Sequence, residues 1–257
     1  MWKRLRIGVL LLVLAVVASD AWFDRQRTTS WEQTVWVGIY PVAGDASAAT
    51  AEYVASLRRA QFVEIENFYA REARRYALAL DPPVRIELYP QRPDVPPLLA
   101  DGTGPLARLL WSLRLRFYAW RTARAPGLPA PHVRLFALYH DPAFTRTVPG
   151  SHAMQKGLVG IVHAFATPAA ASGNNLVIAH EALHTFGATD KYDPRSNAPL
   201  FPDGYGDPAA TPLYPQATAE IMAGRRALTA TRFEETPDLA AVVVGPRTAR
   251  EINWQKP

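Results

Sequence analysis

The sequence predicts a mixed α/β (α+β) domain, in which strands and helices alternate along the chain. Two observations predict this class. Stretches rich in β-branched and aromatic residues, typical of strands, recur between longer stretches whose apolar residues have helical spacing. The chain also has 257 residues, 49% of them hydrophobic and 20% charged, so it can bury one substantial core. We expect a mostly parallel, twisted sheet with long packing helices, preceded by an N-terminal apolar helix.

That apolar segment follows three basic residues among the first six and runs without interruption over residues 7–18. Two interpretations remain open: a cleaved signal peptide, or an uncleaved membrane anchor over residues 1–23. Trp2 and Trp22 stand where interfacial aromatic residues would, which favours the anchor. Because the basic flank stays inside, we expect the domain on the extracytoplasmic side of an inner membrane, or periplasmic or secreted after cleavage.

Residues 24–34 are polar and indicate a linker, so we place one folded domain at residues 35–257. Its first strand is predicted at 35–42, where the sequence VWVGIYPV is β-branched and aromatic. Residues 48–80 contain no proline or glycine and repeat apolar residues at helical spacing, which predicts one long helix. Two prolines end it, and the alternating segment 84–89 predicts a second strand.

A further helix is expected from Pro105, a favoured first-turn residue. We interpret its apolar stripe as core packing; the stripe consists of Leu106, Leu109, Leu110, Leu113, Phe117 and Trp120. A third strand is predicted at 133–139 and a fourth at 157–167, where glycines suggest a bend. The next helix is expected at about 174–186.

The motif that carries chemistry lies in this last helix. His180 and His184 stand four residues apart, so their imidazoles lie one turn apart on the same helical face. Two such imidazoles can reach one zinc ion at about 2.0–2.1 Å. Glu181, beside the first of them, can reach a water on that ion without binding the metal itself. The HExxH pattern arises by chance in roughly 0.6% of shuffled chains of this composition.

Two later residues extend the pattern. Gly187 can adopt a left-handed conformation, which ends the helix and turns the chain back sharply. Asp190 follows the first histidine by ten positions, and the turn lets it approach the ion from beneath. We therefore expect zinc as the cofactor, with His180, His184 and Asp190 as ligands and Glu181 as the catalytic base.

These residues resemble the signature of the metzincin metalloproteases, HExxHxxGxx followed by a histidine or, in a minority such as the snapalysins, an aspartate. Metzincins also have a methionine-containing turn beneath the metal, and the segment around Met222 matches it. The resemblance implies a metzincin-like fold, with the strand at 157–167 at the sheet edge where extended peptides pair. It also implies a zinc endopeptidase that hydrolyses peptide or protein substrates with a metal-activated water.

Other interpretations remain open. Asp190 replaces the commoner third histidine, and Asp193 or Glu220 would be substitute ligands. A gluzincin-like metallopeptidase would use a glutamate well downstream, such as Glu220 or Glu234. A non-catalytic anchored scaffold would hold the metal only for structure. Tyr192 is a candidate hydroxyl near the site.

Composition excludes several classes. The absence of cysteine removes disulfides, thiolate nucleophiles and cysteine-based zinc sites. The net charge of the whole chain is +5. Without residues 1–18 the chain has 25 basic and 23 acidic residues, a net charge of +2, and no nucleic-acid motif is present. We expect no nucleic-acid partner and a membrane contact through the N-terminal segment; an anionic envelope surface is a further candidate partner of the clustered arginines. The loop 190–215 is interpreted as an ordered surface loop, with calcium binding through its aspartates as the alternative.

Overall fold

The structure is a computed structural model. It describes residues 28–99, 104–122, 125–155 and 157–255, together with residues 2, 6–8, 19 and 26. The predicted anchor or signal peptide at 1–23 therefore falls almost wholly outside the described residues. None of the helices in the described part of the chain has the length and apolarity that a bilayer crossing requires.

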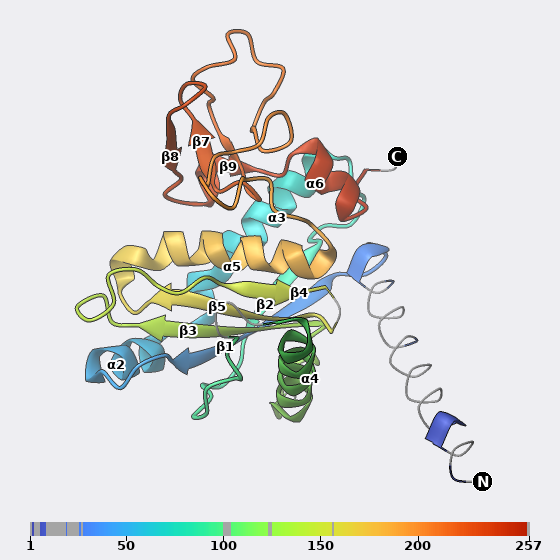
Figure 1. Ribbon diagram of the computed structural model, residues 1–257, viewed down its shortest axis with the longest axis vertical. Coiled ribbons are helices and arrows are strands. Elements are labelled where there is room, and N and C mark those ends of the chain that lie inside the picture. Colours follow the sequence, from blue (N-terminus) through green and yellow to red (C-terminus); the bar gives the residue numbers. More distant parts are fainter. Residues whose placement is uncertain are drawn as a thin grey trace.

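Five strands form the central sheet, in the order β2-β1-β3-β5-β4 (Figure 1). Their bounds are β1 Val35–Ala43, β2 Val84–Leu88, β3 Val133–His140, β4 His152–Met154 and β5 Val159–Phe165. The first four strands in this order are parallel and β4 is antiparallel to β5. The mixed, mostly parallel α/β class is thus confirmed.

The expected position of the fourth strand was wrong. The sequence predicts the strand at 157–167 to be the sheet edge, but β5 is an inner strand and the three-residue β4 covers it. Such a short strand has no sequence pattern of its own, and it forms because a tight connection folds the chain back onto Gly160 and Ile161.

Helices of the described residues cover both faces of the sheet. They are α2 Ala48–Ser56, α3 Val63–Arg75, α4 Pro105–Thr122, α5 Ala171–Phe186 and α6 Pro246–Glu251, with 3-10 turns at Arg59–Phe62, Pro168–Ala170 and Leu239–Ala241. Alternation along β1 sends Val37 and Ile39 to one face of the sheet and Tyr40 and Val42 to the other. Buried residues of α2, α3 and α5 join the first core cluster, and those of α4 join the second.

The single helix expected over 48–80 is broken. α2 ends at Ser56, Leu57 and Arg58 are extended, and α3 begins at Val63. A straight 33-residue helix would be about 50 Å long, too long for one small sheet to cover. The break lets α2 pack on β1 and β3 while α3 packs on β2 and α5, a tertiary effect that periodicity does not reveal.

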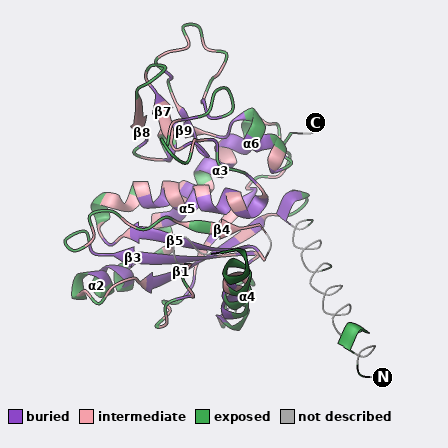
Figure 2. Cartoon of the chain, viewed as in Figure 1, coloured by how far each residue is buried: buried purple, intermediate pink, exposed green. Residues whose placement is uncertain are grey.

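The core packing expected for the stripe of α4 is also wrong. All six stripe residues are exposed, and the buried residues of α4 lie on the opposite face (Figure 2). Leu115, Tyr118 and Ala119 pack on the sheet in the second core cluster. α4 is therefore apolar on two sides, and spacing alone does not tell which side the sheet covers.

The C-terminal part of the chain packs beside α5, on the side away from the sheet (Figure 1). It contains the parallel pair β6 Ala219–Glu220 and β9 Val242–Val243, and the antiparallel pair β7 Arg225–Ala227 and β8 Phe233–Glu235. Trp31, within the segment expected to be a linker, is buried against Phe186 and Trp254. Its Nε1 donates to the Ile252 carbonyl, so the packed domain begins upstream of β1.

Candidate metal centre

The site is built on the C-terminal half of α5, and Gly187 ends that helix as predicted. Its φ of 108° is left-handed, a conformation that a residue with a Cβ rarely adopts. The Gly187 N–H donates to the His184 carbonyl and the Ala188 N–H to the Leu183 carbonyl, which is the pattern of a glycine-terminated helix. The chain therefore turns back under the last helical turn.

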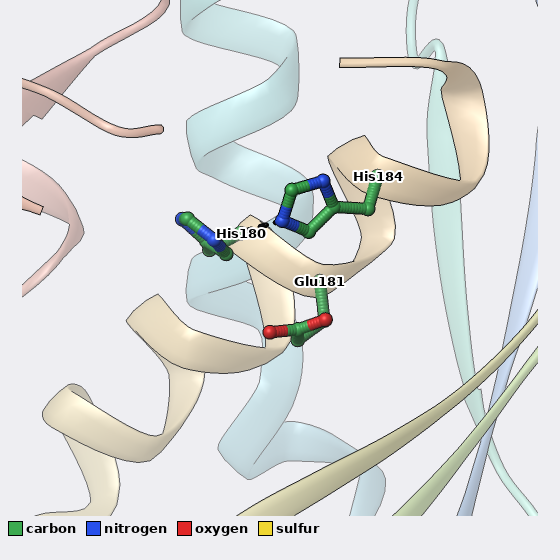
Figure 3. Close-up of side chains that lie close together, drawn as sticks. All are labelled: His180, Glu181 and His184. Carbon is green, nitrogen blue, oxygen red and sulfur yellow. Dashed lines mark hydrogen bonds between the residues drawn. The ribbon is translucent and has the colours of Figure 1, made fainter. Parts of the chain in front are cut away.

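The two histidines face each other across one helical turn. Their Nε2 atoms lie 3.1 Å apart, and Figure 3 shows the two imidazoles and Glu181 projecting from α5. His180 Nδ1 donates to the Ile221 carbonyl at 3.0 Å, and His184 Nδ1 donates to the Ala188 carbonyl at 2.9 Å. Because each Nδ1 donates to a carbonyl, the Nε2 atoms are the ones that face each other, and they would offer lone pairs to a metal ion that displaces a proton.

Asp190 completes this arrangement, as its position in the sequence predicts. Its Oδ1 lies 3.3 Å from His180 Nε2 and 3.2 Å from His184 Nε2. The three donor atoms thus form a nearly equilateral triangle. Ligand atoms about 2.0–2.1 Å from a tetrahedral zinc ion are about 3.3 Å apart, so the triangle has the size that one such ion needs.

The residues on either side hold Asp190 in place. Lys191 N–H donates to the Met222 carbonyl at 2.9 Å, and the buried Lys191 ammonium pairs with Glu251 at 2.8 Å. Thr189 N–H donates to the same Glu251 carboxylate at 2.9 Å. These contacts with α6 and the 219–224 turn fix the backbone on both sides of Asp190, so its carboxylate does not depend on the α5 turn alone.

Charge within the triangle favours a cation. Burial works to lower the pKa of His180, but the hydrogen bond to Asp190 and the charge of Glu181 outweigh it and raise the pKa to about 9. Burial likewise works to raise the pKa of Asp190, but hydrogen bonds from His180 and His184 hold it well below its usual range. A proton or a metal ion between these groups is therefore stabilised.

Glu181 is buried beside the histidines with one oxygen unused. It is 4% exposed, and its Oε2 makes no hydrogen bond within the described part of the chain. Burial raises the pKa of Glu181, against the lowering effect of nearby His180 and His184. A buried carboxylate oxygen normally accepts a hydrogen bond, so the space in front of Glu181 suits a hydrogen-bond donor such as a water molecule.

Glu220, one of the two glutamates considered as alternative ligands, makes hydrogen bonds away from the triangle. Glu220 is fully buried, and its carboxylate accepts hydrogen bonds from the Met222, Ala223 and Gly245 N–H groups and from the Thr248 hydroxyl. These contacts hold the turn after β6. Glu220 therefore shapes the turn whose Ile221 carbonyl orients His180, and it does not join the triangle.

Glu234 forms an ion pair with Arg226 across the β7–β8 hairpin, which leaves it outside the site. Asp193 accepts the Arg195 N–H at 2.7 Å and so caps a turn of the following loop. Among the described residues, one group of three histidine and carboxylate side chains has its ligand atoms all within 4.8 Å of one another, and it consists of His180, Glu181 and His184. Asp190 joins it through the distances of 3.2 and 3.3 Å to the two histidines. The calcium site considered for the 190–215 loop has no such support.

A cleft of about 610 Å³ opens over the triangle and is lined by α5, by β4 and by the turn at 221–224. A second cleft of about 500 Å³ continues from it along α5 toward Gly173. Tyr192 lines both. Burial, with the charges of Asp190 and Glu181, raises the pKa of the Tyr192 phenol, so it stays protonated near the site as a hydrogen-bond donor.

Sequence reasoning missed three histidines that the fold brings together. His163 on β5 and His152 on β4 line the cleft, and His163 Nδ1 lies 2.9 Å from His140 Nε2. Burial lowers the pKa of His163 to about 4, helped by the charges of His140 and His152. They come from separate strands with no motif spacing, so the sequence contains no signal that would pair them.

The residues present fit a divalent metal ion. Two neutral imidazoles with fixed tautomers and one carboxylate are a common catalytic donor set, and their Nδ1 partners are the kind that support metal-binding histidines. The unpaired Glu181 oxygen adds an acceptor beside the open position. No known protein-family model matches the chain, and no curated protein matches it.

Proposed function

We propose that this protein is a zinc-dependent endopeptidase in which His180, His184 and Asp190 hold the metal and Glu181 is the catalytic base. The observation that carries the proposal is the convergence of three donor atoms, each 3.1–3.3 Å from the other two. The metzincin-like spacing of these residues, Gly187 and the turn at Met222 support the same conclusion.

Zinc is the metal that the donor set favours. Imidazole nitrogen suits zinc, copper, iron and nickel, whereas calcium and magnesium prefer oxygen ligands. Three protein ligands leave a fourth position open, which is typical of catalytic rather than structural zinc. When bound, the ion supplies Lewis acidity, which lowers the pKa of water toward about 7 and polarises a carbonyl group.

The protein's own residues perform the remaining steps. The Ile221 and Ala188 carbonyls keep the Nδ1 protons of His180 and His184, so both Nε2 atoms stay available. Glu181 Oε2 accepts a proton from the attacking water and delivers it to the leaving amide nitrogen, so that a C–O bond forms as the C–N bond breaks. Burial of Glu181 raises its pKa, which suits a group that must both accept and release a proton.

The substrate class follows from the shape of the cleft. The two adjoining clefts run along α5, and the cleft over the triangle has β4, the edge strand of the sheet, on one wall. An extended peptide can add to an exposed strand edge through main-chain hydrogen bonds, which are independent of sequence. We therefore propose unfolded or extended polypeptide as the substrate. From the basic and apolar N-terminal sequence we further propose that the activity belongs to the extracytoplasmic side of a membrane.

The test is cleavage of an unfolded protein by the zinc-loaded chain, with metal content measured on the same sample. Glu181→Gln is expected to retain zinc and to lower the cleavage rate by about 10²–10⁴-fold. Glu52→Gln, on the exposed face of α2, is the matched control and keeps full activity. Full activity of Glu181→Gln would refute its role. Stoichiometric zinc without cleavage by the unaltered chain would instead indicate a metal-binding scaffold.

A further inference from the structure

α4 has apolar residues on two opposite faces: one face packs on the sheet, and the other, with six large apolar side chains, is exposed to solvent. At about 100° per residue, its buried residues Leu115, Tyr118 and Ala119 point to the sheet. The outward apolar face points the opposite way within an arc of about 100°. We define this face as Leu106, Leu109, Leu110, Leu113, Phe117 and Trp120.

The exposure of this face is large. Trp120 is 74% exposed, Leu106 70% and Phe117 62%, and Figure 2 shows the exposed side of α4 standing away from the sheet. The Phe117 and Trp120 rings lie 5.9 Å apart, so they form a continuous surface. Single exposed apolar residues are ordinary, but a contiguous patch of six marks an interaction surface.

Arginines border the face on both sides. Arg114 and Arg121 follow one edge of the stripe and Arg116 follows the other, whereas no acidic residue occurs within α4. At this border Asp94 pairs with Arg121 at 3.3 Å and with Arg92 at 3.4 Å. A leucine and aromatic face bordered by arginine is the composition of helices that lie in a bilayer interface.

We propose that the outward face of α4 docks on an anionic lipid bilayer, with its apolar side chains among the lipid headgroups and acyl chains. This surface is separate from the metal centre, and the inference does not rest on the proposed peptidase function. The arginines would contact lipid phosphates while their aliphatic parts extend along the apolar boundary.

The position of α4 in the fold supports a bilayer as the occupant. His132, which precedes β3, pairs with Trp36 at the start of β1 through two hydrogen bonds of 2.8 and 2.9 Å. The start of β1 and the start of β3, which follows α4 in the chain, therefore lie at the same end of the sheet (Figure 1). Beyond that entrance the sequence contains the apolar run 7–18 with its basic flank, so a membrane-held N-terminus would bring this end of the domain to the lipid.

A second copy of the chain fits the face less well. Two such faces would bring Arg114 and Arg121 of one chain toward the same residues of the other, or toward Arg116, without an acid on either helix. Like charges placed together disfavour association. A lipid surface of opposite charge removes that repulsion, which is why we assign the face to lipid.

The absence of cysteine allows a local test in the full-length chain. Leu110 on α4 and Leu200 in the loop after Asp190 are both 48% exposed. The substitutions Leu110→Cys and Leu200→Cys therefore form a matched pair for nitroxide labelling. Each labelled chain is reconstituted with vesicles of phosphatidylcholine alone or mixed with phosphatidylglycerol. Accessibility of the nitroxide to oxygen and to a nickel chelate then gives its depth, independent of what holds the N-terminus.

In the anionic vesicles the label at 110 is expected about 5–10 Å below the lipid headgroup boundary, and the label at 200 in water. Leu106→Glu with Leu113→Glu should return the label at 110 to water. Aqueous exposure of the label at 110 in the anionic vesicles would overturn the proposal, and spin–spin broadening between labels at 110 would assign the face to a second copy. Equal depth in both kinds of vesicle would overturn the requirement for anionic lipid.

Discussion

α4 and α5 are helices of similar length and apolar content, yet the fold treats them in opposite ways. α5 lies between the sheet and the C-terminal part of the chain, and its buried residues come from several faces. α4 is covered on one side only, and its strongest apolar stripe is exposed. The candidate ligand side chains of α5, His180 and His184, are held by hydrogen bonds to backbone carbonyls. The apolar side chains on the outward face of α4 are exposed in the described part of the chain.

The difference teaches what each pattern in the sequence measures. The chemistry of α5 depends on local spacing, because the four-residue separation of the two histidines and a glycine three residues before Asp190 fix directions within one short segment. The packing of α4 depends on which other elements cover it, which is not local. A stripe of apolar residues therefore indicates that something covers it, but not whether the cover is the sheet or another partner.

The largest effect is expected at the metal triangle of α5. Removing a metal ligand costs more than the roughly 10–100-fold that outer partners of a ligand contribute, so Asp190→Ala should weaken zinc binding by at least about 100-fold. Asp193→Ala is the matched control, because its carboxylate caps a turn of the same loop and does not approach the histidines. The measurement is competition titration against a chelator of known affinity.

Equal affinity in Asp190→Ala and the unaltered chain would remove Asp190 from the ligand set. Stronger loss in Asp193→Ala than in Asp190→Ala would transfer the role to the neighbouring aspartate. Either result would also weaken the contrast between the two helices, since the site would no longer follow from spacing around α5.

Much of the fold was predictable because the evidence for it is local. β1, β2, β3, β5 and α5 occur where β-branched runs or helical spacing place them, and Gly187 ends α5 as expected. The break after Ser56, the edge strand β4 and the exposed stripe of α4 were not predictable in this way. Each depends on which distant element competes for the same apolar surface, as the packing of Leu57 into the core shows.

The candidate site divides along the same line. The sequence placed His180, His184 and Asp190 together because a helix and a tight turn fix their geometry, and the structure brings their donor atoms within 3.3 Å. The contacts that hold the site, such as Lys191 with Glu251, join residues 60 positions apart. The same holds for His163 in the cleft, which has no neighbour in sequence that would indicate its role.

The second prediction concerns pH, because the cleft beside α5 contains buried titratable groups. Burial lowers the pKa of His163 to about 4 from its usual 6.5. The unfolded chain then binds a proton that the folded chain resists, so His163 should contribute a fall of about 1–3 kcal/mol in the free energy of unfolding as pH drops from about 6.5 to about 4. Burial raises the pKa of Glu181 and Glu220, which acts in the opposite direction, so the contribution of His163 is measured as a difference between variants. The raised pKa of His180 adds stability that is fully present below 6.5, so His180 contributes no slope in this window.

Urea unfolding between pH 4.5 and 6.5 measures that slope. His163→Asn should remove this contribution, whereas His152→Asn, in an exposed position on β4, should reduce it only in part, because the charge of His152 is one of the causes that lower the pKa of His163. An unaltered slope in His163→Asn would show that other groups cause the loss.

A smaller loss is expected from Gly187→Ala at the end of α5. A left-handed conformation costs a residue with a Cβ about 1–2 kcal/mol, and that Cβ would lie 2.5 Å from Gln155 Nε2, which would have to move. Gly104→Ala, just before α4, is the control, because nothing lies within 4 Å of its added Cβ. Thermal and urea unfolding should separate the two variants, and equal stability would mean that the α5 turn tolerates another conformation.

The smallest effect is expected on the outward face of α4, and its contrast with the buried face tests the comparison most directly. Leu113→Ala should change the free energy of unfolding by less than about 0.5 kcal/mol, as exposed substitutions usually do. Leu115→Ala, two positions along the same helix, should cost about 2–5 kcal/mol because its side chain is fully buried in the second core cluster. The two replacements are chemically identical, so the difference between them isolates which face of α4 the sheet covers. A large loss from Leu113→Ala in lipid-free protein would mean that the outward face is covered by protein, and the bilayer would no longer be needed to explain it.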